Sequence, residues 1–178
     1  MKRLSFSFGI LVLVFIWIYH TAATDYNPPI NRIIGDISYV KKFGHLPSPG
    51  TDMSVRIKTH LAYAEMILRN EDVSYGSKTT RLKREHLLDD LHKYWVAGEF
   101  PINYANNDVH NFCTTFMDGK FCAIGYLYER SMEREMSRIN DRNKKLYVNK
   151  QGDQALNSWI RSSGLTKEEA ALIQPSYN

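Results

Sequence analysis

The most informative part of the chain runs from Phe112 to Leu127 and reads Phe-Cys-Thr-Thr-Phe-Met-Asp-Gly-Lys-Phe-Cys-Ala-Ile-Gly-Tyr-Leu. It contains both cysteines of the chain, Cys113 and Cys122, and an Asp-Gly pair at 118–119. Asp-Gly between residues of high strand propensity is typical of a β-hairpin, because glycine readily adopts the positive φ that such turns need. We therefore expect one small β-hairpin near residues 112–124, set among helices.

The N-terminus has the three parts of a secretory signal peptide. Lys2 and Arg3 precede an apolar run over residues 8–19, and small residues follow at 21–23. Cleavage after Ala23 fits this pattern best and predicts a secreted or periplasmic protein. The alternative is an uncleaved signal anchor that tethers the chain to a membrane, because the uncharged run is only slightly shorter than the ~20 residues that span a bilayer.

Residues 24–178 have the length and composition of one domain with its own core. We divide them into an extended N-terminal arm over 24–50, rich in proline and glycine, and a single domain over 51–178; within the arm, residues 37–40 resemble a strand. The net charge of +4 falls to +2 once Lys2 and Arg3 are removed with the signal peptide. So small a charge predicts no nucleic-acid partner and, after cleavage, no membrane partner.

An exported chain with an even number of cysteines normally forms disulfide bonds. A bridge between Cys113 and Cys122 would stabilise the hairpin by roughly 2–3 kcal/mol. Two registers stay open for it. A three-residue loop over 117–119 places residue 114 opposite Cys122, so the bridge would need a bulge, whereas a four-residue loop over 116–119 pairs the two cysteines directly.

Apolar residues at helical spacing predict helices along most of the remaining chain. The expected ranges are 51–70, 79–97, 126–140, 153–163 and a short helix after Thr166. Gly98 is a typical C-terminal cap, and Thr166 with Glu169 forms a capping box. The expected fold class is therefore α+β, mainly α, with four or five helices around one disulfide-tied β-hairpin.

Five short motifs are spread over most of the chain that follows the signal peptide. They are Arg56-x-x-x-His60-Leu61, Tyr94-Trp95-x-x-Gly98-Glu99-Phe100-Pro101-x-Asn103, Cys122-Ala123-Ile124-Gly125-Tyr126-Leu127, Gly164-Leu165-Thr166-x-Glu168-Glu169 and Ile173-Gln174-Pro175-x-Tyr177. Together they resemble a group of small exported bacterial proteins of unassigned function. The resemblance implies export and a compact fold, and it implies no activity, cofactor or catalytic residue.

A thiol hydrolase is one chemistry that the sequence suggests. Cys113 or Cys122 would be the nucleophile, His110 the base and Asp118 the acid that orients it. A disulfide between the cysteines would remove the nucleophile, so the structural interpretation of both cysteines is favoured. In that interpretation His110 is an exposed loop residue.

A polar stripe on the first long helix offers a second arrangement. Arg56, His60 and Tyr63 recur at i, i+4 and i+7, and could line an acid/base cleft centred on His60. Candidate partners across such a cleft are Asn103, Asp118 and Glu129. More often, a partly buried histidine simply bonds a backbone carbonyl or a carboxylate across a helix interface.

Histidines and aspartates cluster over residues 86–92 without the spacing of a metal site. On a helix, His86 and His92 point well apart, and neither a His-Glu-x-x-His motif nor a Cys-x-x-Cys pair is present. We therefore predict no metal and no cofactor.

The function that these observations favour is that of an exported, non-enzymatic binding or structural module. Its partner would be an unknown protein or small-molecule ligand. The alternative is a small secreted hydrolase that uses a Cys/His pair or the cleft centred on His60.

Overall fold

The computed structural model describes residues 28–73, 76–101, 120–136 and 153–177. These parts contain six helices, α2 (Ile37–Phe43), α3 (Met53–Asn70), α4 (Lys78–Ala97), α5 (Ala123–Met136), α7 (Asp153–Ser163) and α8 (Lys167–Ile173). The signal peptide predicted for residues 1–23 lies outside the described residues. Within them, no helix combines the length and the apolar character that crossing a membrane requires.

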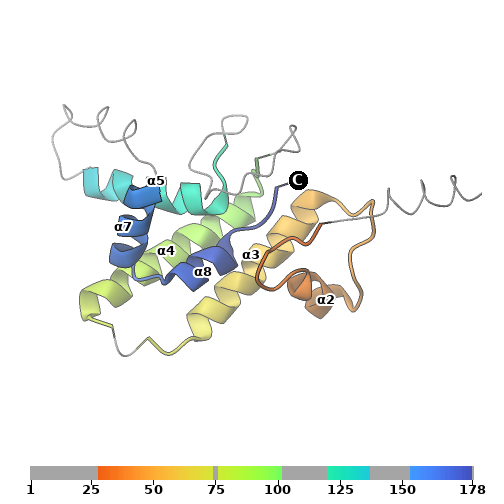
Figure 1. Ribbon diagram of the computed structural model, residues 1–178, viewed down its shortest axis with the longest axis horizontal. Helices are drawn as coiled ribbons and strands as arrows, with labels where there is room; N and C mark the ends of the chain where they lie inside the picture. Colours follow the sequence, from red (N-terminus) through yellow and green to blue (C-terminus); the bar gives the residue numbers. More distant parts are fainter. Residues whose placement is uncertain (1–27, 74–75, 102–119, 137–152, 178) are drawn as a thin grey trace, which may run out of the picture.

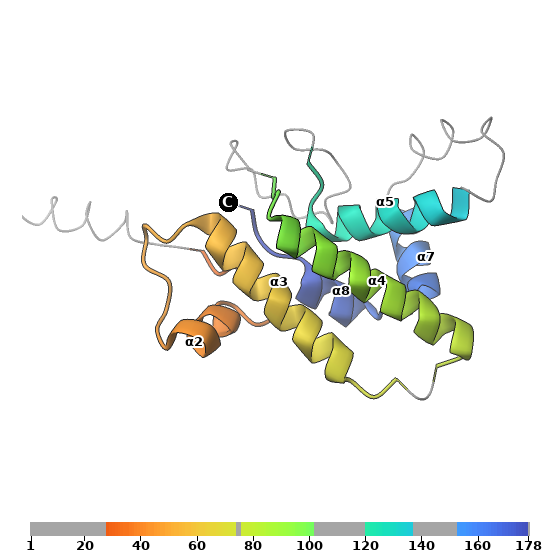
Figure 2. The ribbon, with the colours of Figure 1, turned by 180° about the vertical axis from the view of Figure 1, so that it is seen from behind.

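The two longest helices, α3 and α4, form an antiparallel pair at the centre of the molecule (Figure 1). Their direction is evident from side-chain contacts, since Arg69 of α3 meets Asp89 of α4 and Glu65 meets His92, further along α4. Helix α2 packs on α3, whereas α5 and α7 pack on α4 (Figures 1 and 2). Helix α8 contacts α3, α5 and α7, and the last residues of the described chain run on from its end.

The core is formed by apolar side chains from α3, α4, α5, α7 and α8. The predicted apolar face of α3 is confirmed, because all four of its residues are buried, and α4 contributes four more buried side chains. The buried apolar residues of these two helices are Ile57, Leu61, Ala64, Leu68, Leu87, Leu88, Leu91 and Tyr94. Ile124 and Leu127 of α5, Ile160 of α7 and Ile173 of α8 complete the centre.

The predicted ends of several helices are confirmed by their caps. Asp52 accepts a hydrogen bond from the Ser54 N–H at the start of α3, and Gly98 ends α4 with a φ of 71°. Thr166 and Glu169 form the predicted capping box at the start of α8. These local signals work because each satisfies backbone groups that the helix itself leaves without partners.

The predicted β-hairpin is wrong, and with it the α+β fold class, because the described part of the chain contains helices and no hairpin. Ala123 and Ile124, expected to end the second strand, begin α5 instead, which was predicted to start only at Tyr126. Ile124 and Leu127 are buried and Tyr128 is half-buried on the same face of this helix. The i, i+3, i+4 spacing of these apolar residues outweighs the local strand signal of the Asp-Gly pair, which itself lies outside the described residues.

The predicted disulfide is also wrong. Cys122 is a fully buried cysteine that forms no disulfide bond, and Cys113 lies outside the described residues. The Cys122 Sγ instead accepts a weak hydrogen bond from the Gly125 N–H at 3.4 Å. Cys122 therefore occupies the capping position of α5, where a short polar side chain is useful for a reason unrelated to oxidation.

The strand-like stretch over 37–40 in the predicted extended arm is helical as well. It forms the first part of α2, which ends at Gly44 with a φ of 78°. The arm is anchored at its beginning, where the Ile30 carbonyl accepts a hydrogen bond from the Ser176 N–H at 2.7 Å. The two ends of the described chain thus lie against each other.

Candidate functional site

The C-terminal tail, residues 174–177, closes the N-terminal end of α5. The N–H groups of residues 123–125 would otherwise lack partners inside the helix. The Tyr177 hydroxyl accepts from the first at 2.7 Å and the Gln174 Oε1 from the second at 3.2 Å. The Cys122 Sγ accepts from the third at 3.4 Å, and the Cys122 carbonyl accepts the first regular helical bond, from the Tyr126 N–H at 2.8 Å. The end of α5 is therefore filled by the protein's own groups.

Two tyrosines extend this arrangement into a buried hydrogen-bond chain. The Tyr94 hydroxyl donates to the Phe121 carbonyl at 2.8 Å and lies 3.1 Å from the Tyr177 hydroxyl. Because the Tyr94 proton is used in this way, Tyr177 must donate to Tyr94. Burial raises the pKa of Tyr177 well above its ordinary value, with Tyr94 and Cys122 acting in the same direction, so the donor stays protonated.

Asn31 joins the N-terminal arm to the end of α8. Its amide nitrogen lies 3.0, 3.2 and 2.9 Å from the carbonyl oxygens of residues 171, 172 and 174. Its amide oxygen accepts from the N–H groups of Ile33 and Ile34. The Asn31 side chain thus bonds carbonyls at the end of α8 and also stabilises the turn of the arm that follows it. We call the region formed by Asn31, His60, residues 174–177 and the start of α5 the tail junction.

His60 lies completely buried in the tail junction. Its Nε2 is 2.9 Å from the Leu172 carbonyl oxygen and donates to it, while its Nδ1 has no hydrogen-bond partner among the described residues. Burial lowers the pKa of His60 to about 4, although nearby backbone carbonyls and the charge of Asp36 act in the opposite direction. His60 therefore bonds a backbone carbonyl across the interface between α3 and α8.

Of the other residues predicted for the cleft, three can be placed. Arg56 is buried and donates to the Pro28 carbonyl at 2.7 Å and to Asp36 at 2.9 Å. Tyr63 and Glu129 are half-buried, on α3 and α5. Burial raises the pKa of Glu129, and the charge of nearby Glu133 adds to the shift.

Four candidate residues lie outside the described part of the chain, namely Asn103, His110, Cys113 and Asp118. The predicted groupings of His60 with Asn103 and Asp118, and of His110 with a cysteine, therefore stay predictions.

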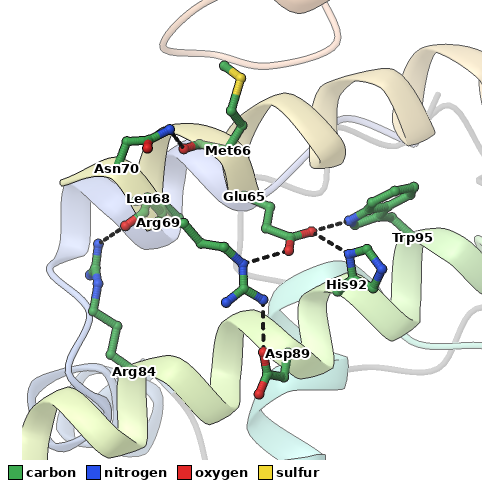
Figure 3. Close-up of polar contacts among 9 residues, drawn as sticks. All are labelled: Glu65, Met66, Leu68, Arg69, Asn70, Arg84, Asp89, His92 and Trp95. Atoms are coloured by element: carbon green, nitrogen blue, oxygen red, sulfur yellow. Dashed lines mark hydrogen bonds and ion pairs between the residues drawn. The ribbon is translucent and has the colours of Figure 1, made fainter.

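A cluster of charged and polar side chains on the surface joins α3 to α4 (Figure 3). Glu65 accepts hydrogen bonds from Arg69 at 2.8 Å, from His92 at 3.1 Å and from Trp95 at 2.5 Å. Burial alone would raise the pKa of Glu65, but the bonds from Trp95, Arg69 and His92 outweigh it and lower the pKa. A carboxylate held in this way is a structural link between two helices.

Asp89, Asp90 and His92 of α4, which could suggest a metal, have protein partners. Asp89 binds Arg69 at 2.9 Å, and the Lys93 ammonium lies 3.5 Å from Asp90 (Figure 3 shows the first pair). His92 faces Glu65. Within the described residues, no three His, Cys, Asp or Glu side chains are grouped closely enough to hold a metal ion.

Arg84 connects α4 to two loops and to α8. It donates to the Leu68 and Gly164 carbonyls at 3.0 and 3.2 Å, and it pairs with Glu71 at 3.0 Å and Glu169 at 2.6 Å. A hydrogen bond with Glu169, together with burial, raises the pKa of Glu71. Burial opposes a low pKa at Glu169, but its bonds to Glu71, Thr166 and Arg84 lower it. The Arg84 guanidinium thus pairs with two carboxyl groups, those of Glu71 and Glu169.

A row of exposed apolar side chains runs along the N-terminal arm and α2. Its members are Ile33, Ile37, Val40, Phe43 and Leu46, which are 55, 47, 38, 40 and 69% exposed. We call these five residues the apolar row. On α2 the inward positions are taken by Ser38 and Tyr39, which are buried. Sequence reasoning missed the row because the 37–40 stretch was interpreted as a strand, although the spacing 33, 37, 40 is helical.

Comparisons of this chain with known protein families, with curated proteins and with solved structures found no match.

Proposed function

We propose that the protein is an exported, non-enzymatic binding or structural module that acts through the apolar row. The observation that carries this proposal is the concentration of exposed apolar side chains in one short segment, residues 33–46. Contiguous apolar patches at a protein surface typically mark sites of interaction, because leaving them in water costs free energy.

The polar candidates support the same conclusion by the contacts they make. His60 and Arg56 bond backbone carbonyls and Asp36 in the interior. Glu65, the most highly coordinated carboxylate of the surface cluster, already accepts three hydrogen bonds. These groups hold helices together, whereas the apolar row has no such role in the described structure.

Site-specific photocrosslinking in the exporting cells tests the proposal. A benzophenone amino acid would replace Val40 in the full chain, and a second version would carry it at Leu82. Both positions are similarly exposed, at 38% and 46%, and Leu82 lies on the first turns of α4, far from α2 (Figures 1 and 2). We expect a specific adduct at Val40 and none at Leu82.

The adduct at Val40 should also disappear when Ile37→Gln and Leu46→Gln are introduced together. Both side chains are exposed, so these changes leave the core intact. Equal crosslinking from Val40 and Leu82, or an adduct that survives the two substitutions, would contradict the proposal.

A further inference from the structure

We propose that the apolar row docks on the surface of an anionic lipid bilayer. This inference rests on the proposed function, because it names the partner of the same surface. It replaces the expectation of no membrane partner, which considered only the net charge of the chain. The apolar side chains would enter the boundary between headgroups and acyl chains, and the neighbouring lysines would lie among the lipid phosphates.

The orientation of α2 is the first argument. Ile37 and Val40 face solvent, whereas Ser38 and Tyr39 are buried against the rest of the molecule. At ~100° per residue, Ile37, Val40 and Lys41 lie within about 100° of one another around the helix axis. The face turned away from the protein therefore combines apolar and basic side chains, as in segments that lie at a membrane interface.

The charge of the segment is the second argument. Lys41 and Lys42 are exposed, and the Lys42 ammonium lies 5.3 Å from the centre of the Phe43 ring, beside the apolar row. No acidic residue occurs between Ile37 and Thr51. The nearest one before them, Asp36, is bound to Arg56 at 2.9 Å. The surroundings of the row are therefore positive and complement anionic headgroups.

The chain that precedes the arm is the third argument. The apolar run over residues 8–19 is connected to Ile33 by residues 20–32, which reach at most ~45 Å when fully extended. While the run is inserted in a bilayer, the apolar row is held within that distance of the lipid surface. This applies during export and, in the alternative of an uncleaved anchor, permanently.

A second copy of the chain fits the apolar row less well. Five partly exposed side chains offer only a few hundred Å² of apolar surface, whereas each partner in a stable complex buries ~800 Å². In a symmetric dimer through this row, Lys41 and Lys42 of both copies would lie close together. Both features favour a lipid surface, which binds small apolar patches with basic neighbours.

The test uses the full chain in vesicles of phosphatidylcholine with and without phosphatidylglycerol. The benzophenone amino acid is placed at Val40 or at Leu82, and lipid adducts are measured by mass spectrometry. Both versions carry the same N-terminal run, and because anchoring by that run holds the arm close to either kind of vesicle, the dependence of the Val40 adduct on phosphatidylglycerol separates docking from anchoring. We expect the lipid adduct at Val40 alone, and more of it when phosphatidylglycerol is present.

Charge-removing variants sharpen this test. Lys41→Gln and Lys42→Gln should each lower the lipid adduct at Val40 by about fivefold in the anionic vesicles, because each basic residue near such a surface contributes similarly to binding. Lys93→Gln, an exposed lysine on α4, is the matched control and should leave the adduct unchanged.

The outcomes separate the two proposals. An adduct at Val40 with a second copy of the chain or, in cells, with another protein instead of lipid would overturn bilayer docking and leave the proposed function standing. Equal lipid adducts with and without phosphatidylglycerol would overturn the anionic specificity. Equal adducts at Val40 and Leu82 in both vesicles and cells would overturn both proposals.

Discussion

Asn31 of the tail junction lies close in the sequence to Ile33, the first residue of the apolar row. The two regions nevertheless differ in how their side chains are used. In the tail junction, Asn31 satisfies carbonyls at the end of α8 and two N–H groups of its own turn. On α2, Ser38 is buried with no hydrogen-bond partner for its hydroxyl among the described residues, while Ile37 and Val40 face solvent. The first arrangement favours stability. The second costs stability, which is the usual mark of a surface kept for binding.

The largest effect on stability is expected at Arg84, which bonds backbone carbonyls of distant segments as Asn31 does. Arg84→Met should lower the free energy of unfolding by about 4 kcal/mol, because it leaves the buried Glu169 without its guanidinium partner. Arg69→Met is the control, since the Arg69 side chain is 38% exposed and that of Arg84 only 4%. Arg69→Met should cost at most ~1 kcal/mol. Equal effects in urea unfolding would contradict the distinction.

Two glycines with the same backbone conformation compare the interior with the α2 segment. Gly164 has a φ of +88°, and a Cβ there would lie 2.6 Å from the Thr80 carbonyl oxygen, whereas Gly44 has a φ of +78° and open space around it. Gly164→Ala should therefore cost about 3 kcal/mol, from both strain and a steric clash, and Gly44→Ala about 1 kcal/mol from strain alone. Thermal unfolding of the two variants measures the difference, and a Gly44 effect as large as that of Gly164 would refute it.

His60 makes the stability of the tail junction depend on pH. Its pKa is about 4 in the folded protein, against 6.5 as the ordinary value, so folding favours the neutral ring. The stabilisation is complete above the unfolded pKa and is lost as the pH falls from 6.5 toward 4. Between pH 7 and pH 5 this amounts to roughly 2 kcal/mol.

His60→Gln removes this titration while it keeps a donor for the Leu172 carbonyl. The wild type should lose about 2 kcal/mol more than the variant between pH 7 and pH 5 in urea unfolding. Parallel losses in the two proteins would show that folding does not lower the pKa of His60.

The smallest effect on stability is expected in the apolar row. Ile37→Gln and Leu46→Gln should each change the free energy of unfolding by less than about 0.5 kcal/mol, because both side chains are exposed and fill no core position. Ile57→Gln, at a buried position of α3, is the contrasting substitution and should destabilise strongly. A large loss at Ile37 or Leu46 would mean that the row packs inside the protein.

Much of the helical framework could be predicted from the sequence. The ranges of α3, α4, α7 and α8 follow from apolar spacing and from local caps such as Asp52, Gly98 and the Thr166–Glu169 box. These signals act within a few residues, so the sequence contains all the information they need. The start of α5 was predicted at Tyr126, three residues late, because its first N–H groups are satisfied by a distant tail.

The hairpin and disulfide errors share one physical cause. The hairpin was predicted from an Asp-Gly pair and the disulfide from the number of cysteines, and both inferences considered Cys122 in its local context only. In the structure, Cys122 lies next to Tyr177 and Gln174 at the start of α5. Residues so far apart in sequence give no local signal of their contact.

By itself, the sequence determined where most helices begin and end and which of their faces are apolar, because capping and helical periodicity are local properties. Only the tertiary structure decided what each polar side chain bonds to. It buried His60 against α8, placed residues 174–177 at the N-terminal end of α5 and left the apolar row exposed. Such pairings depend on which distant segments meet, and that is fixed when the whole core packs together.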